Sequence, residues 1–248
     1  MQGTGTAPIP SGVMEPAVEL HPHLAEARRP GTVRVDMHSH TCYSGDAVTT
    51  IDELAERVES AALDVLCITD HHAVRGAVEA RARGIGCRVV VGEEVRTRAG
   101  EVIGLFLDER IPHGLTPEET IGRIRSQGGV VYVPHPFDPV RRPLAEPVLR
   151  DLAGQGQIDA VEVLNAKVSL DHLNSRAGDF ATSAGLPGGA GSDAHDPAGI
   201  GAAYVEMPDF DGPDDFLARL GEGRIVGHRF DRARPFTPRI IPSGLTPG

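Results

Sequence analysis

Histidine and acidic residues gather in short clusters along this chain, and most of the clusters follow a run of apolar residues. The clusters are Asp36-Met37-His38-Ser39-His40, Asp46, Asp70-His71-His72, Glu93-Glu94, His135 and Asp193-Ala194-His195. Imidazole nitrogens suit zinc, manganese and iron, and a carboxylate can bridge two cations. Mixed shells of this kind are typical of hydrolytic centres, so the pattern predicts a site for several metal ions.

The first cluster has the spacing of a compact chelate. Residues two apart on an extended strand point to the same side, so His38 and His40 would present two imidazoles together. The turn that follows would fold Asp46 back over the same metal. Asp36 is placed to orient a ligand from behind the metal shell.

Short β-branched runs alternate with helical patterns, which favours a parallel sheet. Thr50-Ile51-Asp52-Glu53 and Thr116-Pro117-Glu118-Glu119 are capping boxes, and each predicts the start of a helix. The candidate ligands follow many different strands. A closed barrel brings all of these strand ends to one face, whereas an open sheet gathers only those near its switch point. The predicted strands cover residues 33–37, 65–69, 89–91, 102–107, 130–133 and 160–164.

The composition is typical of one globular domain. Of the 248 residues, 40% are hydrophobic and 24% are charged. No apolar run approaches the ~20 residues that span a bilayer, so we expect no membrane partner. The net charge of −11 argues against an extended nucleic-acid surface, because such surfaces use Lys and Arg to neutralise phosphates. The three cysteines lack C-x-x-C spacing, so they predict neither a disulfide framework nor a zinc ribbon.

Proline-rich segments flank the predicted barrel. We expect a flexible Pro-rich N-terminal arm over residues 1–30, the barrel over residues 31–228 and an irregular C-terminal tail over residues 229–248. The arm does not have the basic region and apolar region of a secretory signal, so the expected location is cytoplasmic. The sequence leaves the oligomeric state open.

The motifs resemble, in the same order, those of the PHP family, the polymerase and histidinol phosphatase superfamily of metal-dependent phosphoesterases. The matching segments are Asp36-Met37-His38-Ser39-His40-Thr41, Ile68-Thr69-Asp70-His71, Gly92-Glu93-Glu94-Val95, Val133-Pro134-His135-Pro136 and Gly191-Ser192-Asp193-Ala194-His195. The resemblance runs from residue 33 to residue 228. It implies an α/β fold: a distorted, TIM-like (β/α)7 barrel in a single domain, with metals at the carboxyl ends of its strands.

The resemblance also implies two to three divalent metal ions, with manganese, zinc and iron as the candidates. The first metal would take His38, His40, Glu94 and Asp193. The second would share Glu94 and take His135. The third would take Asp46, His71 and His195. Glu94 is the expected bridge because the family carries its acid at the third position of a Gly-x-Glu motif, and Glu93 would then face the opposite side of the strand.

One position departs from the family pattern. Many members supply a further histidine from the start of the next strand, where this chain has Glu101. A carboxylate is a competent ligand and would shift the site toward harder metals such as manganese. The alternative is that Glu101 is a solvent-exposed acid in the turn after Gly100.

Candidate residues for substrate are mainly arginines, because the planar guanidinium matches phosphate oxygens. They are Arg141, Arg142 and Arg176, together with Asn165 in a strand-end motif that resembles one of the family's. Surface pairing with carboxylates is the alternative role for each arginine. Asp70 or His195 would donate a proton to the leaving group.

The remaining histidines fall outside the matching motifs or beside them. His72 adjoins a candidate ligand but points away from it on a strand, so it would lie behind the metal shell at most. The others are expected in loops or on the surface, and they are His21, His23, His113, His172 and His228.

The predicted activity is metal-dependent hydrolysis of phosphate esters. A water that bridges two metals would attack phosphorus in line. A polymeric substrate would need a continuous basic surface or a domain inserted between the metal motifs, and the sequence shows neither. This favours a phosphomonoesterase that acts on a small phosphorylated metabolite or nucleotide. The alternatives are a nuclease or nucleotide 3′-phosphatase, a histidinol-phosphate-type phosphatase and, in a different class, a non-catalytic metal-stabilised PHP module.

We expect the purified protein to carry two to three metal ions per chain, because the candidate ligands fill three shells that share one bridging carboxylate. Elemental analysis after reconstitution with manganese, zinc or iron measures this number. Less than one equivalent with all three metals would contradict the metal-site prediction.

Overall fold

A computed structural model describes residues 20–230 of the chain. Residues 1–19 of the predicted arm and residues 231–248 of the predicted tail lie outside the described residues. The nine strands in the described part are β1 (Thr32–Ser39), β2 (Val65–Ile68), β3 (Arg88–Thr97), β4 (Gly100–Leu105), β5 (Val130–Val133), β6 (Ala160–Asn165), β7 (Gly188–Gly191), β8 (Ala203–Pro208) and β9 (Arg224–Gly227). Its α-helices are α1 (Ile51–Ala61), α2 (Arg75–Arg83), α3 (Pro117–Ser126), α4 (Glu146–Gly154), α5 (Asp171–Ala184) and α6 (Gly212–Leu220).

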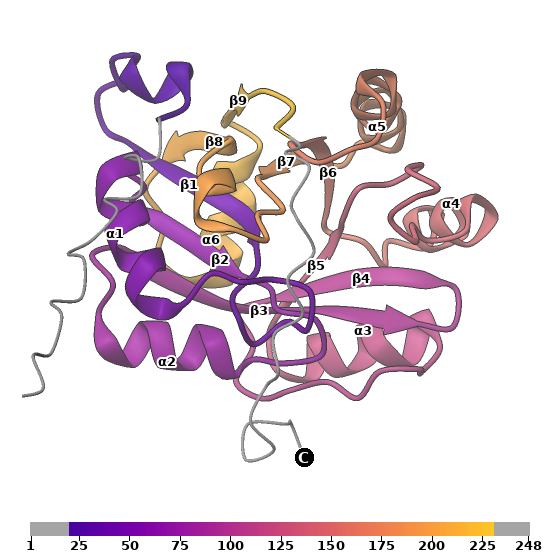
Figure 1. The fold of residues 1–248 in the computed structure, drawn as a ribbon. Coiled ribbons are helices and arrows are strands. Elements are labelled where there is room, and N and C mark those ends of the chain that lie inside the picture. Colours follow the sequence, from indigo (N-terminus) through magenta and orange to yellow (C-terminus); the bar gives the residue numbers. More distant parts are fainter. Residues whose placement is uncertain (1–19, 231–248) are drawn as a thin grey trace, which may run out of the picture.

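The strands form one curved sheet in the order β7-β6-β5-β4-β3-β2-β1-β8-β9, and the helices pack around it (Figure 1). The sheet nearly closes where β7 returns beside β1. Just beyond β7, the Asp193 amide donates to the His38 carbonyl at 2.7 Å, and the His40 amide donates to the Ala194 carbonyl at 2.9 Å. The TIM-like α/β barrel predicted from the sequence is confirmed.

The sheet is mixed, whereas the sequence pattern favoured a parallel sheet. β1, β2 and β3 are parallel to one another, and so are β5, β6 and β7, but β4 runs antiparallel to both β3 and β5. The last two strands are also antiparallel to their neighbours. The connection from β3 to β4 is a short hairpin, and a hairpin requires the chain to reverse direction. The amino end of β4 therefore meets the carboxyl ends of the parallel strands.

Both predicted capping boxes start helices. The Thr50 hydroxyl accepts from the Glu53 amide at the start of α1, and the Glu53 carboxylate accepts from the Thr50 amide. Thr116 and Glu119 make the same reciprocal pair at α3, with Pro117 as the first helical residue. These bonds satisfy amides that have no partner within the helix, so the helix starts are encoded locally.

Two apolar layers hold the sheet from opposite sides. The outer layer joins alternate strand residues to the inward faces of α1 to α5 and includes Leu54 of α1 and Leu66 of β2. The inner layer fills the barrel with the other strand residues, including Met37 and Tyr132, and α6 completes it with Phe216. The ligand clusters therefore stand on a sheet that is packed on both faces, which limits their movement.

Strand β7 is made of Gly188-Gly189-Ala190-Gly191, and the sequence analysis missed it because no β-branched residue marks it. The structure requires these small residues. A Cβ at Gly189 would lie 2.8 Å from side-chain atoms of Met37 and Tyr132, and a Cβ at Gly191 would lie 2.3 Å from the Cβ of His38. Glycine therefore lets β7 approach β1 closely enough to close the barrel.

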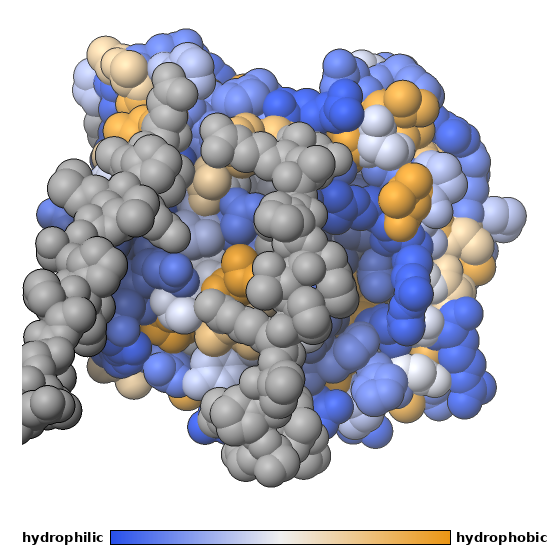
Figure 2. Space-filling view, in the orientation of Figure 1, coloured by the Kyte–Doolittle hydropathy of each residue, from blue (hydrophilic) through white to orange (hydrophobic). Residues whose placement is uncertain are grey.

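Figure 2 shows one face of the molecule. The coloured residues on this face are mainly hydrophilic, and the apolar ones form small separate patches. Within residues 20–230, every helix is too short or too polar to cross a lipid bilayer. Cys67 is buried, whereas Cys42 and Cys87 are partly exposed.

Three histidines expected in loops or on the surface lie together where the two ends of the described chain meet. His21 is 4% exposed, and His23 and His228 bring their Nδ1 atoms within 3.1 Å of each other. His23 Nε2 must donate to the Gly201 carbonyl, because a carbonyl only accepts, so His23 Nδ1 accepts from His228 Nδ1. His23 must therefore be neutral in this arrangement of the terminal histidine cluster, which is formed by His21, His23 and His228.

We expect the terminal histidine cluster to weaken the fold in mild acid. Burial, aided by Arg57, lowers the pKa of His21 from 6.5 to about 4, and burial lowers the pKa of His23 as well. As the pH falls from about 6.5 toward about 4, the unfolded chain takes up protons that the folded chain refuses, so stability falls over this window. His21→Gln should reduce this pH dependence, measured by chemical denaturation, whereas His172→Gln, at an exposed residue of α5, should not. Equal pH slopes for both variants would contradict the assignment.

Candidate metal centre

Four ligand atoms predicted for the first metal converge at the carboxyl end of the barrel. His38 Nε2 lies 3.1 Å from His40 Nε2 and 3.3 Å from Glu94 Oε2. Asp193 Oδ1 lies 3.7 Å from His38 Nε2 and 3.4 Å from His40 Nε2. All four side chains are buried, yet they come from β1, β3 and the segment after β7.

Glu94 also reaches the residues predicted for the second metal. Its other oxygen, Oε1, lies 2.9 Å from His135 Nε2. Glu94, Glu101 and His135 each bring one ligand atom within 4.8 Å of the other two. Glu101 is 7% exposed and is therefore not the solvent-exposed turn acid considered as its alternative. It reaches this cluster because it lies at the amino end of the antiparallel strand β4.

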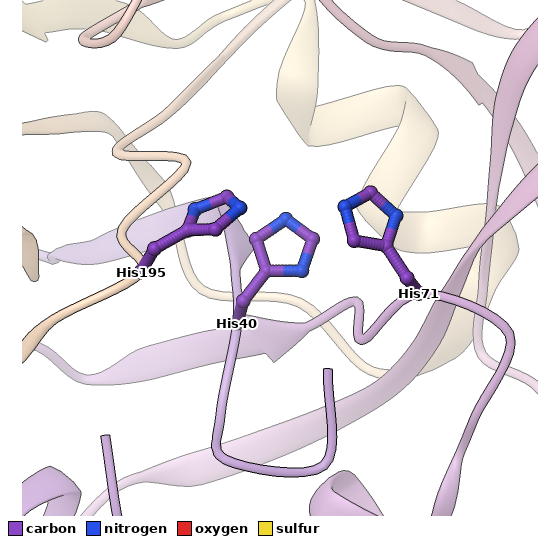
Figure 3. Close-up of side chains that lie close together, drawn as sticks. All are labelled: His40, His71 and His195. Atoms are coloured by element: carbon purple, nitrogen blue, oxygen red, sulfur yellow. The ribbon is translucent and has the colours of Figure 1, made fainter. Parts of the chain in front are cut away.

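The residues predicted for the third metal meet at the open side of the cluster. Asp46 Oδ2 lies 3.5 Å from His71 Nε2 and 3.4 Å from His195 Nε2. Figure 3 shows the imidazoles of His71 and His195 on either side of His40, and the ring centroid of His40 lies 4.6 Å and 4.3 Å from theirs. Asp46 is the most exposed of these ligands, with 58% of its side chain accessible.

Alternation along β3 separates the two neighbouring glutamates. Glu94 points into the ligand cluster, whereas Glu93 accepts from the Ile111 amide at 2.7 Å on the other side of the strand. Burial raises the pKa of Glu93 to about 7. The geometry is therefore that expected for Glu94 as the bridge, and Glu93 is a buried acid outside the cluster.

Several side chains of the ligand cluster have strongly shifted pKa values. Burial opposes a charge on His38, but the carboxylates of Glu162, Asp193 and Glu94 outweigh it and raise its pKa well above 6.5. Burial and the adjacent Glu94 charge raise the pKa of Glu101 to about 7. Burial and then His40 lower the pKa of His195 to about 4, so His195 is neutral at neutral pH.

The donor set fits divalent cations. Carboxylate oxygens can only accept hydrogen bonds, and buried carboxylates are stable when a cation compensates them. His38 Nδ1 faces Glu162 Oε1 at 3.1 Å and His195 Nδ1 faces the Asp193 carbonyl at 2.8 Å, so in their neutral, metal-binding form both rings turn the lone pair of Nε2 inward. Lone pairs and carboxylate oxygens thus point at common centres, as metal ligands do.

A cavity of about 420 Å³ opens over the ligands. Arg141 and Arg142, two of the candidate substrate-binding residues, line this cavity. Arg141 donates to Asp193 Oδ2 at 3.0 Å and to the Lys167 carbonyl at 2.9 Å, so its guanidinium is held against a candidate metal ligand. Arg142 is exposed, and its carbonyl accepts from the Glu101 amide.

Three predicted site residues do not reach this cavity. Asp70 is fully buried and accepts from Thr41 and Ser44, so it shapes the loop before Asp46 and is not placed as a proton donor. Asn165 is fully buried behind Asp193 and not in contact with the cavity. Arg176 lies on α5, where it pairs with Glu146. Closeness to a motif in the sequence did not show that these side chains face away from the cavity. Their orientation depends on which side of a loop, strand or helix faces the cavity in the folded barrel.

Other cavity residues were missed by the sequence analysis. Arg96 is exposed on β3 directly across from Glu101, and Val140 is 72% exposed at the cavity mouth. His72 also lines the cavity, with φ 56°, because the chain turns after Asp70 and does not continue as a strand. The expectation that His72 points away from the site, which assumed the alternation of side chains along a strand, is therefore wrong. Strand alternation could have found Arg96, which is two residues after Glu94 and shares its face.

Comparisons with known proteins identify the family of this chain. The family described as "PHP domain" matches residues 36–131, and the family described as "PHP-associated" matches residues 171–225. The uncharacterized protein MJ1587 of Methanocaldococcus jannaschii is 40% identical over 146 residues, which cover 54% of this chain and 82% of that protein. The chain therefore belongs to the PHP family.

Solved structures share the fold at low sequence identity. A two-domain Bacteroides vulgatus protein containing a predicted PHP-like metal-dependent phosphoesterase has a TM-score of 0.65 at 18% identity, over 82% of this chain and 70% of that chain. An amidohydrolase from Chromobacterium violaceum, solved with bound sulfate and no metal, has a TM-score of 0.55 at 18% identity, over 66% of this chain and 88% of that chain.

Glu101 should tune metal preference. Its anionic oxygen beside Glu94 adds negative charge to the second cluster and favours manganese or iron(II), whereas an imidazole favours zinc. Glu101→His should raise zinc-supported relative to manganese-supported turnover at least severalfold, and parallel assays with each metal measure this ratio. Glu109→His, at an exposed acid, is the control. A wild-type metal profile for both Glu101→His and Glu101→Ala would remove Glu101 from the site.

Proposed function

We propose that the protein is a metal-dependent phosphomonoesterase that acts on a small phosphorylated metabolite or nucleotide. The observation that carries this proposal is the convergence of imidazole and carboxylate groups from six strands, or from the segments directly after them, beneath a cavity with arginines at its edge. The ligand atoms are present at all three predicted metal positions, which favours an enzyme over the alternative of a non-catalytic module. Two to three divalent ions are the proposed cofactors.

The proposed ligands would hold three ions, two of which would share Glu94. His38, His40 and Asp193 would hold one ion, and Glu94 would join it to the position beside His135 and Glu101. Asp46, His71 and His195 would hold the third at the open side. Bound ions would supply Lewis-acid stabilisation of negative charge at the phosphoryl group.

The chain's own residues would bind and orient the ester. Arg142 and Arg96 are exposed at the cavity edge, where they can donate to phosphate oxygens. His195 donates its Nδ1 proton to a carbonyl and keeps a lone pair at Nε2, so it is arranged as a ligand more than as a proton donor. Val140 offers an apolar contact for the leaving group.

Activity with chromogenic phosphate esters tests this function. Chelation should abolish turnover of a monoester, added manganese should restore it, and the monoester should be cleaved faster than the matching diester. Asp193→Ala should lower turnover by about a hundredfold or more, because it removes a ligand and unpairs Arg141, whereas exposed His172→Ala should match the wild type. Preferred diester cleavage would indicate the nuclease alternative, and metal-independent turnover or none would contradict the proposal.

The cavity arginines should affect substrate binding more than chemistry. Arg96→Ala or Arg142→Ala should each raise KM for a phosphate ester by about tenfold, which corresponds to about 1.4 kcal/mol, with a smaller change in kcat. Arg176→Ala is the matched control, since this arginine pairs with Glu146 outside the cavity. Steady-state kinetics of the three variants decide the matter, and an equal KM for all of them would place phosphate recognition elsewhere.

A further inference from the structure

The carboxylate of Glu162 lies behind the metal ligands and does not line the cavity. It stands on β6, is 0% exposed, and receives three hydrogen bonds. Oε1 accepts from His38 Nδ1 at 3.1 Å. Oε2 accepts from the His135 amide at 2.6 Å and from Asn165 Nδ2 at 2.9 Å.

Building on the proposed function, we propose that Glu162 is a positioning residue that orients ligands of two different metals from a single carboxylate. Its first oxygen sets the tautomer of His38. An ionised carboxylate can only accept, so a neutral His38, the form that binds a metal, must carry its proton on Nδ1, and the lone pair of Nε2 then faces His40 and Glu94.

The second oxygen holds the backbone of His135. This residue has φ 28°, in a region that is unfavourable for residues other than glycine. The short bond from its amide to Glu162 is a contact that keeps this conformation, and the conformation directs His135 Nε2 to Glu94 Oε1 at 2.9 Å. Glu162 therefore acts on the second cluster through the main chain.

Asn165 extends the same network to a third ligand. Its Nδ2 atom donates both to Glu162 Oε2 at 2.9 Å and to Asp193 Oδ2 at 3.2 Å. The amide thus ties Glu162 to a carboxylate of the first cluster. This contact explains why Asn165 is buried at the strand end and does not line the cavity.

The neighbouring strand leaves room for this arrangement. A Cβ at Gly191 would lie 2.8 Å from Glu162 Oε1 and 2.3 Å from the Cβ of His38. A side chain at this position would push apart the pair that Glu162 and His38 form. The missing side chain on β7 is thus part of the geometry that lets one carboxylate serve both ligands.

Glutamine cannot replace Glu162 in this role. All three partners are donors, whereas an amide has one accepting oxygen and one donating nitrogen. If the nitrogen faces His38, it selects the tautomer with a proton on Nε2, the ligand atom. If it faces His135 and Asn165, it opposes two other donors. Glu162→Gln should therefore weaken metal binding about 10- to 100-fold, the usual effect of losing such a partner.

Equilibrium dialysis with manganese alone and with zinc alone tests the proposal without relying on activity. The matched control is Glu93→Gln, which alters another fully buried acid on the outer face of β3. We expect Glu162→Gln to lose metal affinity, Glu162→Asp to recover part of it because it keeps two accepting oxygens, and Glu93→Gln to bind like the wild type. Circular dichroism establishes that each variant is folded.

The outcomes separate this inference from the proposed function. A wild-type protein that binds neither metal overturns both. A wild-type protein that binds metal with the same affinity as a folded Glu162→Gln variant overturns the positioning role alone. If Glu162→Gln does not fold, the imidazole resonances of the zinc-loaded wild type decide: a proton on His38 Nδ1 supports the role, and its absence overturns it.

Discussion

Compensation of buried negative charge is the constraint on which the rest of this structure depends. Glu94 is 1% exposed, and its two oxygens face different partners: Oε2 approaches His38, His40 and His71, and Oε1 approaches His135. A buried carboxylate without compensation is costly. The barrel therefore has to deliver cationic or metal-holding groups to this one point from several strands, and the packing on both faces of the sheet keeps them there.

The direction of each strand determines which side chains reach the ligand cluster. In a wholly parallel barrel the start of a strand lies at the end opposite the site. Here β4 reverses between β3 and β5, so Glu101 at its amino end reaches the same mouth as His135 after β5. Arg141 then donates to Asp193, which places a fixed positive charge beside the cluster. The site is thus a balance of acids, imidazoles and one held guanidinium.

Local patterns were sufficient for much of the fold and for the choice of candidate ligands. The capping boxes start α1 and α3, because their hydrogen bonds lie within four residues. The H-x-H motif presents His38 and His40 together, since the spacing of side chains along a strand is a local property. The same spacing separates Glu94 from Glu93. The direction of β4 follows from the short turn between Thr97 and Gly100, a local hairpin that the sequence analysis did not identify. The glycine strand β7 carries little local signal, because its small residues are required by Met37, Tyr132 and His38, which are far away in the sequence.

The sequence by itself determined which residues could bind metal and where helices begin, because side-chain chemistry and short-range hydrogen bonds specify both. Only the tertiary structure decided which polar residues face the cavity. Asp70 shares a motif with His71, and Asn165 lies in a strand-end motif of its own, yet both are buried behind the candidate ligands. Arg176 turns outward from α5. Arg96 and Glu101 reach the cavity because a hairpin sets them opposite each other. Exposure of a side chain depends on contacts between distant segments, and such contacts exist only once the barrel has closed.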